Sequence, residues 1–192
     1  MILYHGTQNG ELKELRLDFN SGRKDDTAKI YLTDSYEAAF LYAACTVRCY
    51  RFDKDNDVLC FLEYAPDGFK KMYKGHGCYI FKIEIDNPEK VENHPIAGHV
   101  YSYDKNIKLD KKNREHIPDC YEKLLQLEKD GKIKLFRWED RSEENKRMVK
   151  ENFIKRYLPT MRESKEKYPQ DYKVLTAFYP ELAVDEKTEN KR

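Results

Sequence analysis

The chain has 192 residues, of which 40% are hydrophobic and 37% are charged. This length fits one medium-sized domain, or one domain with an appendage, and provides enough apolar residues for a core. The 36 Lys and Arg residues nearly balance the 35 Asp and Glu residues, which gives a formal net charge of +1. That balance does not favour bulk electrostatic capture of DNA or RNA, although it leaves room for a local basic patch.

The cysteines and the N-terminus predict a cytoplasmic protein without a metal site. The number of cysteines is odd, no pair has Cys-x-x-Cys spacing, and a zinc site on Cys45 and Cys49 needs two further ligands. We therefore expect reduced thiols used as small apolar residues. The N-terminus has no charged region followed by an apolar one, so no signal peptide is expected. No run approaches 18 apolar residues, so no membrane span is expected.

In the first half of the chain, short apolar runs alternate with turns. Residues 8–29 are polar and predict a loop with one helical turn at 11–15. Asp34 and Glu37 have the spacing of a capping box, and the small apolar residues 38–44 that follow predict a helix. Strands are expected at residues 2–4, 30–32, 58–64, 79–85, 91–93 and 98–103.

The second half changes to helical periodicity. Apolar residues between 117 and 127 form a helical stripe, and Gly131 lies where a C-terminal cap is expected. Residues 132–138 predict a strand and residues 143–167 a charged helical region. The polar tail at 185–192 predicts disorder.

Basic and aromatic residues interleave at 69–74, a pattern that can bind single-stranded nucleic acid. We expect instead a solvated helical turn with an aromatic anchor.

Three motifs in a fixed order carry a family resemblance. The first strand runs into Tyr4-His5-Gly6-Thr7, and Ile30-Tyr31-Leu32-Thr33 precedes the small-residue helix. The strand Tyr79-Ile80-Phe81-Lys82-Ile83-Glu84 comes later, and a helix, a glycine and a strand follow between Tyr121 and Leu135. This order resembles the ADP-ribosyltransferase superfamily with its His-Tyr-acid triad, and among its branches most resembles the rifamycin ADP-ribosyltransferase group.

The resemblance implies an α+β fold with a split antiparallel β core, flanking helices and an NAD-binding cleft in residues 1–140. Residues 45–77 have no counterpart in the compact rifamycin enzymes and are interpreted as an insertion beside the cleft. Residues 141–192 form a C-terminal helical appendage and polar tail. Because both parts can reshape the acceptor side, rifamycin as a substrate does not carry over.

The resemblance also implies a catalytic triad. His5 corresponds to the histidine that orients NAD through a ribose hydroxyl, and Tyr31 to the aromatic residue that stacks on nicotinamide. The family's spacing places the acidic residue at Glu92, with Glu89 and Asp104 as alternatives. We expect His5 and Tyr31 to line one cleft.

Gly6, Thr7 and Tyr36 are the further NAD-binding candidates. At Gly6 the missing side chain lets a ligand approach the backbone, and the Thr7 hydroxyl can donate and accept hydrogen bonds.

The implied function is mono-ADP-ribosyl transfer from NAD, used as a substrate, to an unknown acceptor. Cleavage of the nicotinamide bond develops positive charge on the ribose, which a carboxylate stabilises. An RNA 2'-phosphotransferase-like NAD enzyme is the nearest alternative, although no arginine stands beside His5. A non-catalytic binding module on the same fold is the alternative from another class.

Overall fold

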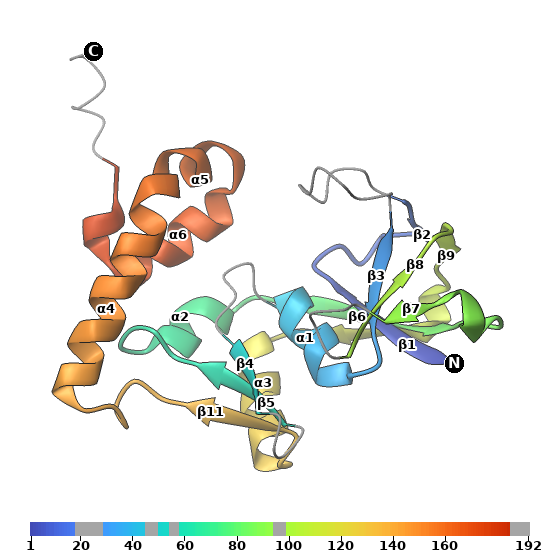
Figure 1. Cartoon of the computed structure of the whole chain (residues 1–192), viewed down its shortest axis with the longest axis horizontal. Coiled ribbons are helices and arrows are strands. Elements are labelled where there is room, and N and C mark those ends of the chain that lie inside the picture. The colour runs from blue at the N-terminus through green and yellow to red at the C-terminus, as the bar shows by residue number, and fades with distance from the viewer. Residues whose placement is uncertain (18–28, 45–49, 54–57, 94–98, 185–192) are drawn as a thin grey trace. The chain divides into compact units, whose positions relative to one another are not determined.

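The computed structural model describes residues 1–17, 29–44, 50–53, 58–93 and 99–184. The chain divides into two compact units (Figure 1). The first unit combines Met1–Cys45 with Gly75–Leu124, and the second combines Thr46–Lys74 with Leu125–Arg192.

A six-stranded antiparallel sheet forms the first unit. Its strand order is β10-β6-β1-β3-β8-β7, so most neighbours in the sheet, β7 and β8 excepted, are not consecutive strands in the chain. In chain order the strands are β1 (Ile2–Thr7), β3 (Ile30–Thr33), β6 (Cys78–Glu84), β7 (Glu92–Asn93), β8 (Val100–Tyr103) and β10 (Arg114–Ile117).

One hydrophobic core of this unit lies on the face of the sheet that carries Leu3. Side chains alternate between the two faces of a strand, and directly opposed residues of antiparallel strands share a face. The pairing of Leu3 with Ile83 therefore places both on the core face, as does the pairing of His5 with Phe81. The buried core cluster is Leu3, Leu15, Ile30, Leu32, Phe81, Ile83 and Ile85.

A small two-stranded sheet, β2 (Glu14–Leu15) with β9 (Ile107–Lys108), adds to this core through Leu15. The predicted helical turn at 11–15 is therefore wrong. A two-residue strand is defined by its partner, which here lies more than ninety residues away in the sequence, so the local sequence carries little signal for it.

Helix α1 (Tyr36–Ala44) follows β3, as the small-residue run predicted. Its N-terminal cap is Ser35 rather than the expected Asp34: the Ser35 hydroxyl oxygen accepts a hydrogen bond from the Ala38 amide at 3.1 Å and donates to the Glu37 carboxylate at 3.0 Å. The Asp34 carboxylate instead bonds to two side chains near the start of β8.

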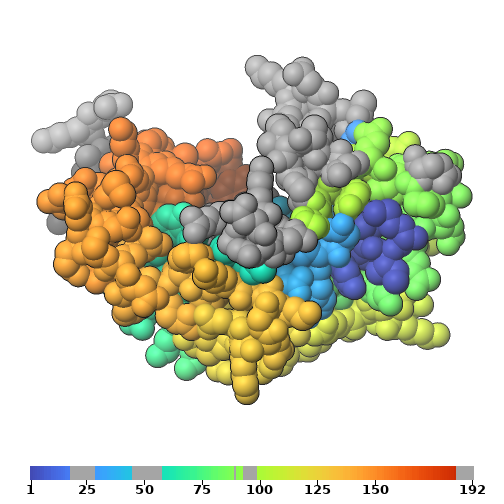
Figure 2. All heavy atoms as spheres, turned by 60° about the horizontal axis from the view of Figure 1, so that its bottom comes forward, coloured from blue at the N-terminus to red at the C-terminus, as the bar shows by residue number. Residues whose placement is uncertain are grey.

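Gly6 is the point at which α1 approaches β1 most closely. A Cβ atom added there would lie 1.9 Å from the carbonyl oxygen of Ala39 and 2.9 Å from the Cβ of Ala43. The N-terminal segment and α1 lie in contact at the surface (Figure 2). The space beside the Gly6 α-carbon, expected to receive a ligand, is therefore filled by the helix backbone.

The chain passes from the first unit to the second within α3 (Cys120–Lys129). Gly131 follows the end of the helix, has a φ of 69° and so adopts the left-handed conformation expected of a glycine cap. The predicted helix began at 117, but Ile117 still belongs to β10 and pairs with Cys78.

The second unit has a three-stranded sheet and several helices. The strand order in this sheet is β11-β5-β4, and β11 runs parallel to β5. The strands are β4 (Tyr50–Asp53), β5 (Val58–Leu62) and β11 (Ile133–Phe136), and the helices are α2 (Gly68–Tyr73), α4 (Glu143–Tyr157), α5 (Met161–Lys167) and α6 (Pro169–Phe178).

Helix α2 confirms the expected helical turn within residues 69–74. Phe69, Met72 and Tyr73 are buried, whereas Lys70 and Lys71 are exposed. Because the aromatic rings lie inside the unit, they offer no surface on which nucleic-acid bases could stack.

The predicted α+β class and the C-terminal helical region are confirmed. Residues 58–74, within the predicted insertion, group with the C-terminal part of the chain in the second unit. The predicted disorder at 185–192 concerns residues outside those described.

Candidate functional site

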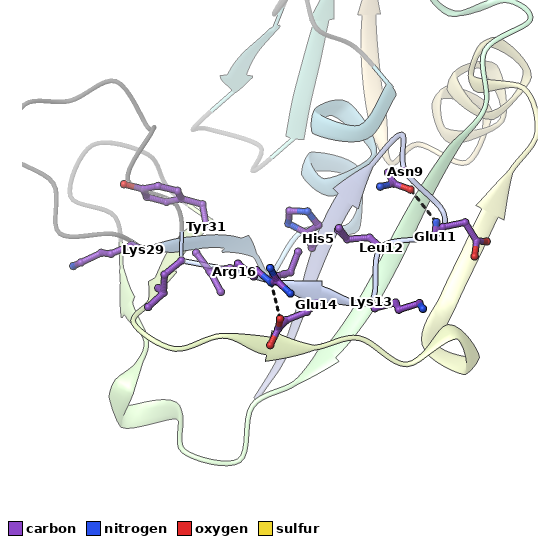
Figure 3. Close-up of a pocket in the computed structure, with 12 residues that line it drawn as sticks. His5, Asn9, Glu11, Leu12, Lys13, Glu14, Arg16, Lys29 and Tyr31 are labelled. Atoms are coloured by element: carbon purple, nitrogen blue, oxygen red, sulfur yellow. Dashed lines mark hydrogen bonds and ion pairs between the residues drawn. The ribbon is translucent and has the colours of Figure 1, made fainter.

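A cavity of about 760 Å³ opens in the first unit and contains His5 (Figure 3). Its volume lies within the range of small-molecule sites, about 300–1,000 Å³. The wall of the cavity is formed by both apolar and charged residues. The lining residues are His5, Asn9, Glu11, Leu12, Lys13, Glu14, Leu15, Arg16, Leu17, Lys29, Ile30 and Tyr31.

His5 is a half-buried residue at this cavity. Burial lowers the pKa of its imidazole below the ordinary value, and a hydrogen bond with the Tyr31 backbone only partly offsets this effect. His5 is therefore neutral at pH 7. A neutral imidazole that donates one N–H to a backbone carbonyl keeps its second ring nitrogen as an acceptor.

His5 and Tyr31 both line the cavity, but their side chains leave the sheet on opposite faces. Tyr4 pairs with Thr33, so the alternation along each strand directs Tyr31 to the face of Tyr4 and His5 to the face of Leu3. The Tyr31 ring points away from His5 (Figure 3). His5 thus meets the backbone of Tyr31, and the expected convergence of the two rings is not seen.

Glu92 lies on the same face of the sheet as Tyr31. Tyr31 pairs with Ser102, and Ser102 pairs with Glu92. The backbones of Tyr31 and Glu92 are therefore two strand spacings apart, or about 10 Å. The Glu92 side chain is 70% exposed and forms an ion pair with Lys29, which lines the cavity although Glu92 does not.

Thr7 and Tyr36, the other NAD-binding candidates, do not line this cavity. The Thr7 hydroxyl accepts a hydrogen bond from the Asn9 amide at 3.1 Å and shapes the turn after β1. The Tyr36 ring contacts Tyr4 edge to face, and its hydroxyl donates to Glu115 at 2.9 Å. Burial, followed by the Glu115 carboxylate, raises the pKa of Tyr36 well above its usual value.

Two carboxylates on the cavity wall, Glu11 and Glu14, were not predicted from the sequence. Glu11 bonds to Lys111 and approaches Arg114 at 3.6 Å, and these cations lower its pKa. Glu14 accepts from Arg16 Nε at 2.8 Å. In the sequence, both lie in a polar stretch that looks like an ordinary solvated loop. Only the folded structure shows that they line the cavity.

The alternatives for the acidic residue are not brought to the cavity. Asp104 is exposed after β8 and does not line it, and the side chain of Glu89 lies outside what is described.

Among the residues that the structure describes, no group of three or more His, Cys, Asp or Glu side chains could hold a metal ion. Cys45 and Cys49, the cysteine pair with helical spacing, lie outside that part of the chain.

Among the helices described here, none is both long and apolar enough to cross a membrane.

Comparisons with protein-family models, with curated proteins and with solved structures gave no match to this chain. Inferences about the function of this chain therefore depend on the cavity and its residues.

Proposed function

We propose that the chain binds NAD at the cavity beside His5 and transfers ADP-ribose to an acceptor that is still unknown. The observation that carries this proposal is the placement of His5 at the wall of a cavity of about 760 Å³, where the Tyr31 backbone is hydrogen-bonded to the imidazole and burial lowers its pKa, which favours the neutral ring. The resemblance of the Tyr4–Thr7 and Ile30–Thr33 motifs to the ADP-ribosyltransferases gives the reason to choose NAD.

A ribose hydroxyl fits the free nitrogen of His5. The hydroxyl donates a hydrogen bond, and the unprotonated ring nitrogen accepts it. Because the other nitrogen is already engaged, the ring is held in one orientation before the ligand arrives, which lowers the entropy lost on binding. Protonation of His5 would replace this acceptor with a second donor and would weaken the contact.

His5 and Tyr31 both line the cavity, although they lie on adjacent strands and on opposite faces of the sheet. A dinucleotide bound in this cavity would contact His5 and could reach Tyr31 at another part of the wall.

The chemical step needs a carboxylate near the ribose. Cleavage of the glycosidic bond releases neutral nicotinamide and leaves positive charge on the ribose, which the acceptor nucleophile then attacks. Glu92 is our first candidate because it shares the face of Tyr31. Glu14, which lines the cavity as His5 does, is the candidate for the other face.

Release of nicotinamide from NAD tests the proposal. With water as the acceptor, the products are ADP-ribose, nicotinamide and a proton, so a slow background reaction is expected without the natural acceptor. His5→Gln should weaken NAD binding, whereas Glu92→Gln should slow release about 100-fold and leave binding within about tenfold. Glu84→Gln, an exposed change on β6 away from the cavity, is the matched control.

A non-catalytic binding module is the second candidate, and the opposite faces of His5 and Tyr31 favour it. A triad that does not converge can still bind a nucleotide without cleaving it. Saturable NAD binding that requires His5, with no nicotinamide release above the uncatalysed rate, would support the module and exclude the transferase.

A further inference from the structure

Two buried cysteines meet in the first unit. Cys78 is the first residue of β6 and Cys120 the first residue of α3, and both side chains have 0% exposure. Both are free thiols, and the Cys120 side chain is the largest cause that raises the pKa of the Cys78 thiol, which places the two side chains near each other.

The backbone around the pair is fixed from both sides. Cys78 pairs with Ile117 across the β6–β10 ladder. The Cys120 amide donates to the His76 carbonyl at 2.8 Å, and the Gly75 amide donates to the Asp119 carboxylate at 3.0 Å. These bonds hold the two segments that carry the thiols next to each other.

We propose that Cys78 and Cys120 form a disulfide-forming site, oxidised by a low-molecular-weight disulfide such as glutathione disulfide. One cysteine thiolate attacks the glutathione disulfide, forms a mixed disulfide and releases one glutathione thiolate. The second cysteine thiolate then attacks the protein sulfur of the mixed disulfide and displaces the other glutathione thiolate. The protein loses two protons and two electrons, and glutathione disulfide becomes two molecules of glutathione.

The rate of this reaction depends on the burial of Cys78 and on its interaction with Cys120. The hydrogen bond with Cys120, together with burial, raises the pKa of the Cys78 thiol, which keeps it protonated in the closed structure. Formation of the Cys78 thiolate, the attacking species, is therefore favoured when the start of β6 and the start of α3 separate. Oxidation should accelerate under conditions that promote this opening.

The bond would close a loop that contains β7, β8 and β10. A cross-link of this length restricts the unfolded chain and stabilises the folded one, provided that it does not distort the native geometry. Because β6 is the neighbour of β1, the cross-link would hold the strand beside the one that carries His5.

The test uses the full chain with Cys45→Ser and Cys49→Ser, which removes two thiols that are not part of the pair. This protein is incubated with glutathione disulfide in buffer and in low urea, then analysed by intact mass and peptide mapping. We expect a loss of about 2 Da, mapped to a bond between Cys78 and Cys120 and reversed by a reductant. Cys120→Ser should abolish the loss, and the matched control Cys60→Ser, which changes another buried free thiol, should not.

A second readout is the stability of the first unit. The oxidised protein should melt about 5 °C or more above the reduced protein. A bond that maps to Cys60, or the absence of any bond even in low urea, would overturn the proposal. A lower melting temperature after oxidation would overturn it as well, because a bond that matches the native geometry should stabilise the unit.

Discussion

Replacing Gly6 with alanine separates a structural role of this glycine from a role in ligand binding. The new Cβ would lie 1.9 Å from the carbonyl oxygen of Ala39, whereas ordinary contacts begin near 3.4 Å. Helix α1 or strand β1 must therefore move by about 1.5 Å, and the atom in the way belongs to the backbone and cannot rotate aside. Overpacking of a core typically costs about 1–3 kcal/mol, and we expect Gly6→Ala to lie at the top of this range.

Gly75→Ala is the matched control for this change. Gly75 belongs to the same unit, has a φ of 76°, and leaves open space around an added Cβ. Its substitution should cost only the strain of the left-handed conformation, about 1–2 kcal/mol.

Hydrogen exchange of the β1 and α1 amides is the appropriate assay for both variants. The single tryptophan, Trp138, lies in the second unit and would not report on the first. The reasoning predicts faster exchange in Gly6→Ala than in Gly75→Ala. Wild-type exchange in Gly6→Ala combined with lost NAD binding would refute it, because the glycine would then serve the ligand and not the helix.

Three further predictions follow from single side chains. His5 has a lowered pKa in the folded state, so the unfolded chain takes up a proton first as the pH falls below about 6.5. The free energy of unfolding should therefore decrease as the pH falls through this range, and less so in His5→Gln, as urea titrations at several pH values would show. The buried Glu63 carboxylate accepts hydrogen bonds from two backbone N–H groups, at 2.8 and 2.9 Å. Glu63→Gln points the new side-chain NH2 group at one of these N–H donors and should lower the free energy of unfolding by about 2–4 kcal/mol. Denaturant unfolding followed by Trp138 fluorescence measures this cost, and an unchanged unfolding midpoint would contradict it. Tyr36→Phe removes the hydrogen bond from the Tyr36 hydroxyl to Glu115 and should lower the free energy of unfolding by about 1 kcal/mol. It should leave the NAD affinity measured by calorimetry unchanged, whereas a tenfold loss of NAD affinity would place Tyr36 in the site.

Sequence patterns anticipated elements whose signal is local. The alternation in β6, the small residues of α1 and the glycine after α3 each predicted the observed element. The cap of α1 was assigned to Asp34 because its spacing to Glu37 fits a capping box. The next residue, Ser35, takes this role instead, since Asp34 bonds to side chains brought close by β8.

The site depends on register, which one strand alone does not define. Period-two alternation identifies which residues of β1 share a face, but only the pairing of Tyr4 with Thr33 relates that face to the face of Tyr31. The same limit applies to Glu14, whose position at the cavity depends on the pairing of β2 with β9. His5 was found from its motif, whereas the carboxylates beside it were not.

A crystal structure of the full chain with NAD tests the central claim most directly. The account predicts NAD in the cavity, with a ribose hydroxyl within hydrogen-bonding distance of the His5 ring nitrogen that does not contact Tyr31. It also predicts that the nicotinamide end lies towards Tyr31, at another part of the cavity wall. NAD bound elsewhere, or an empty cavity at millimolar NAD, would contradict the account.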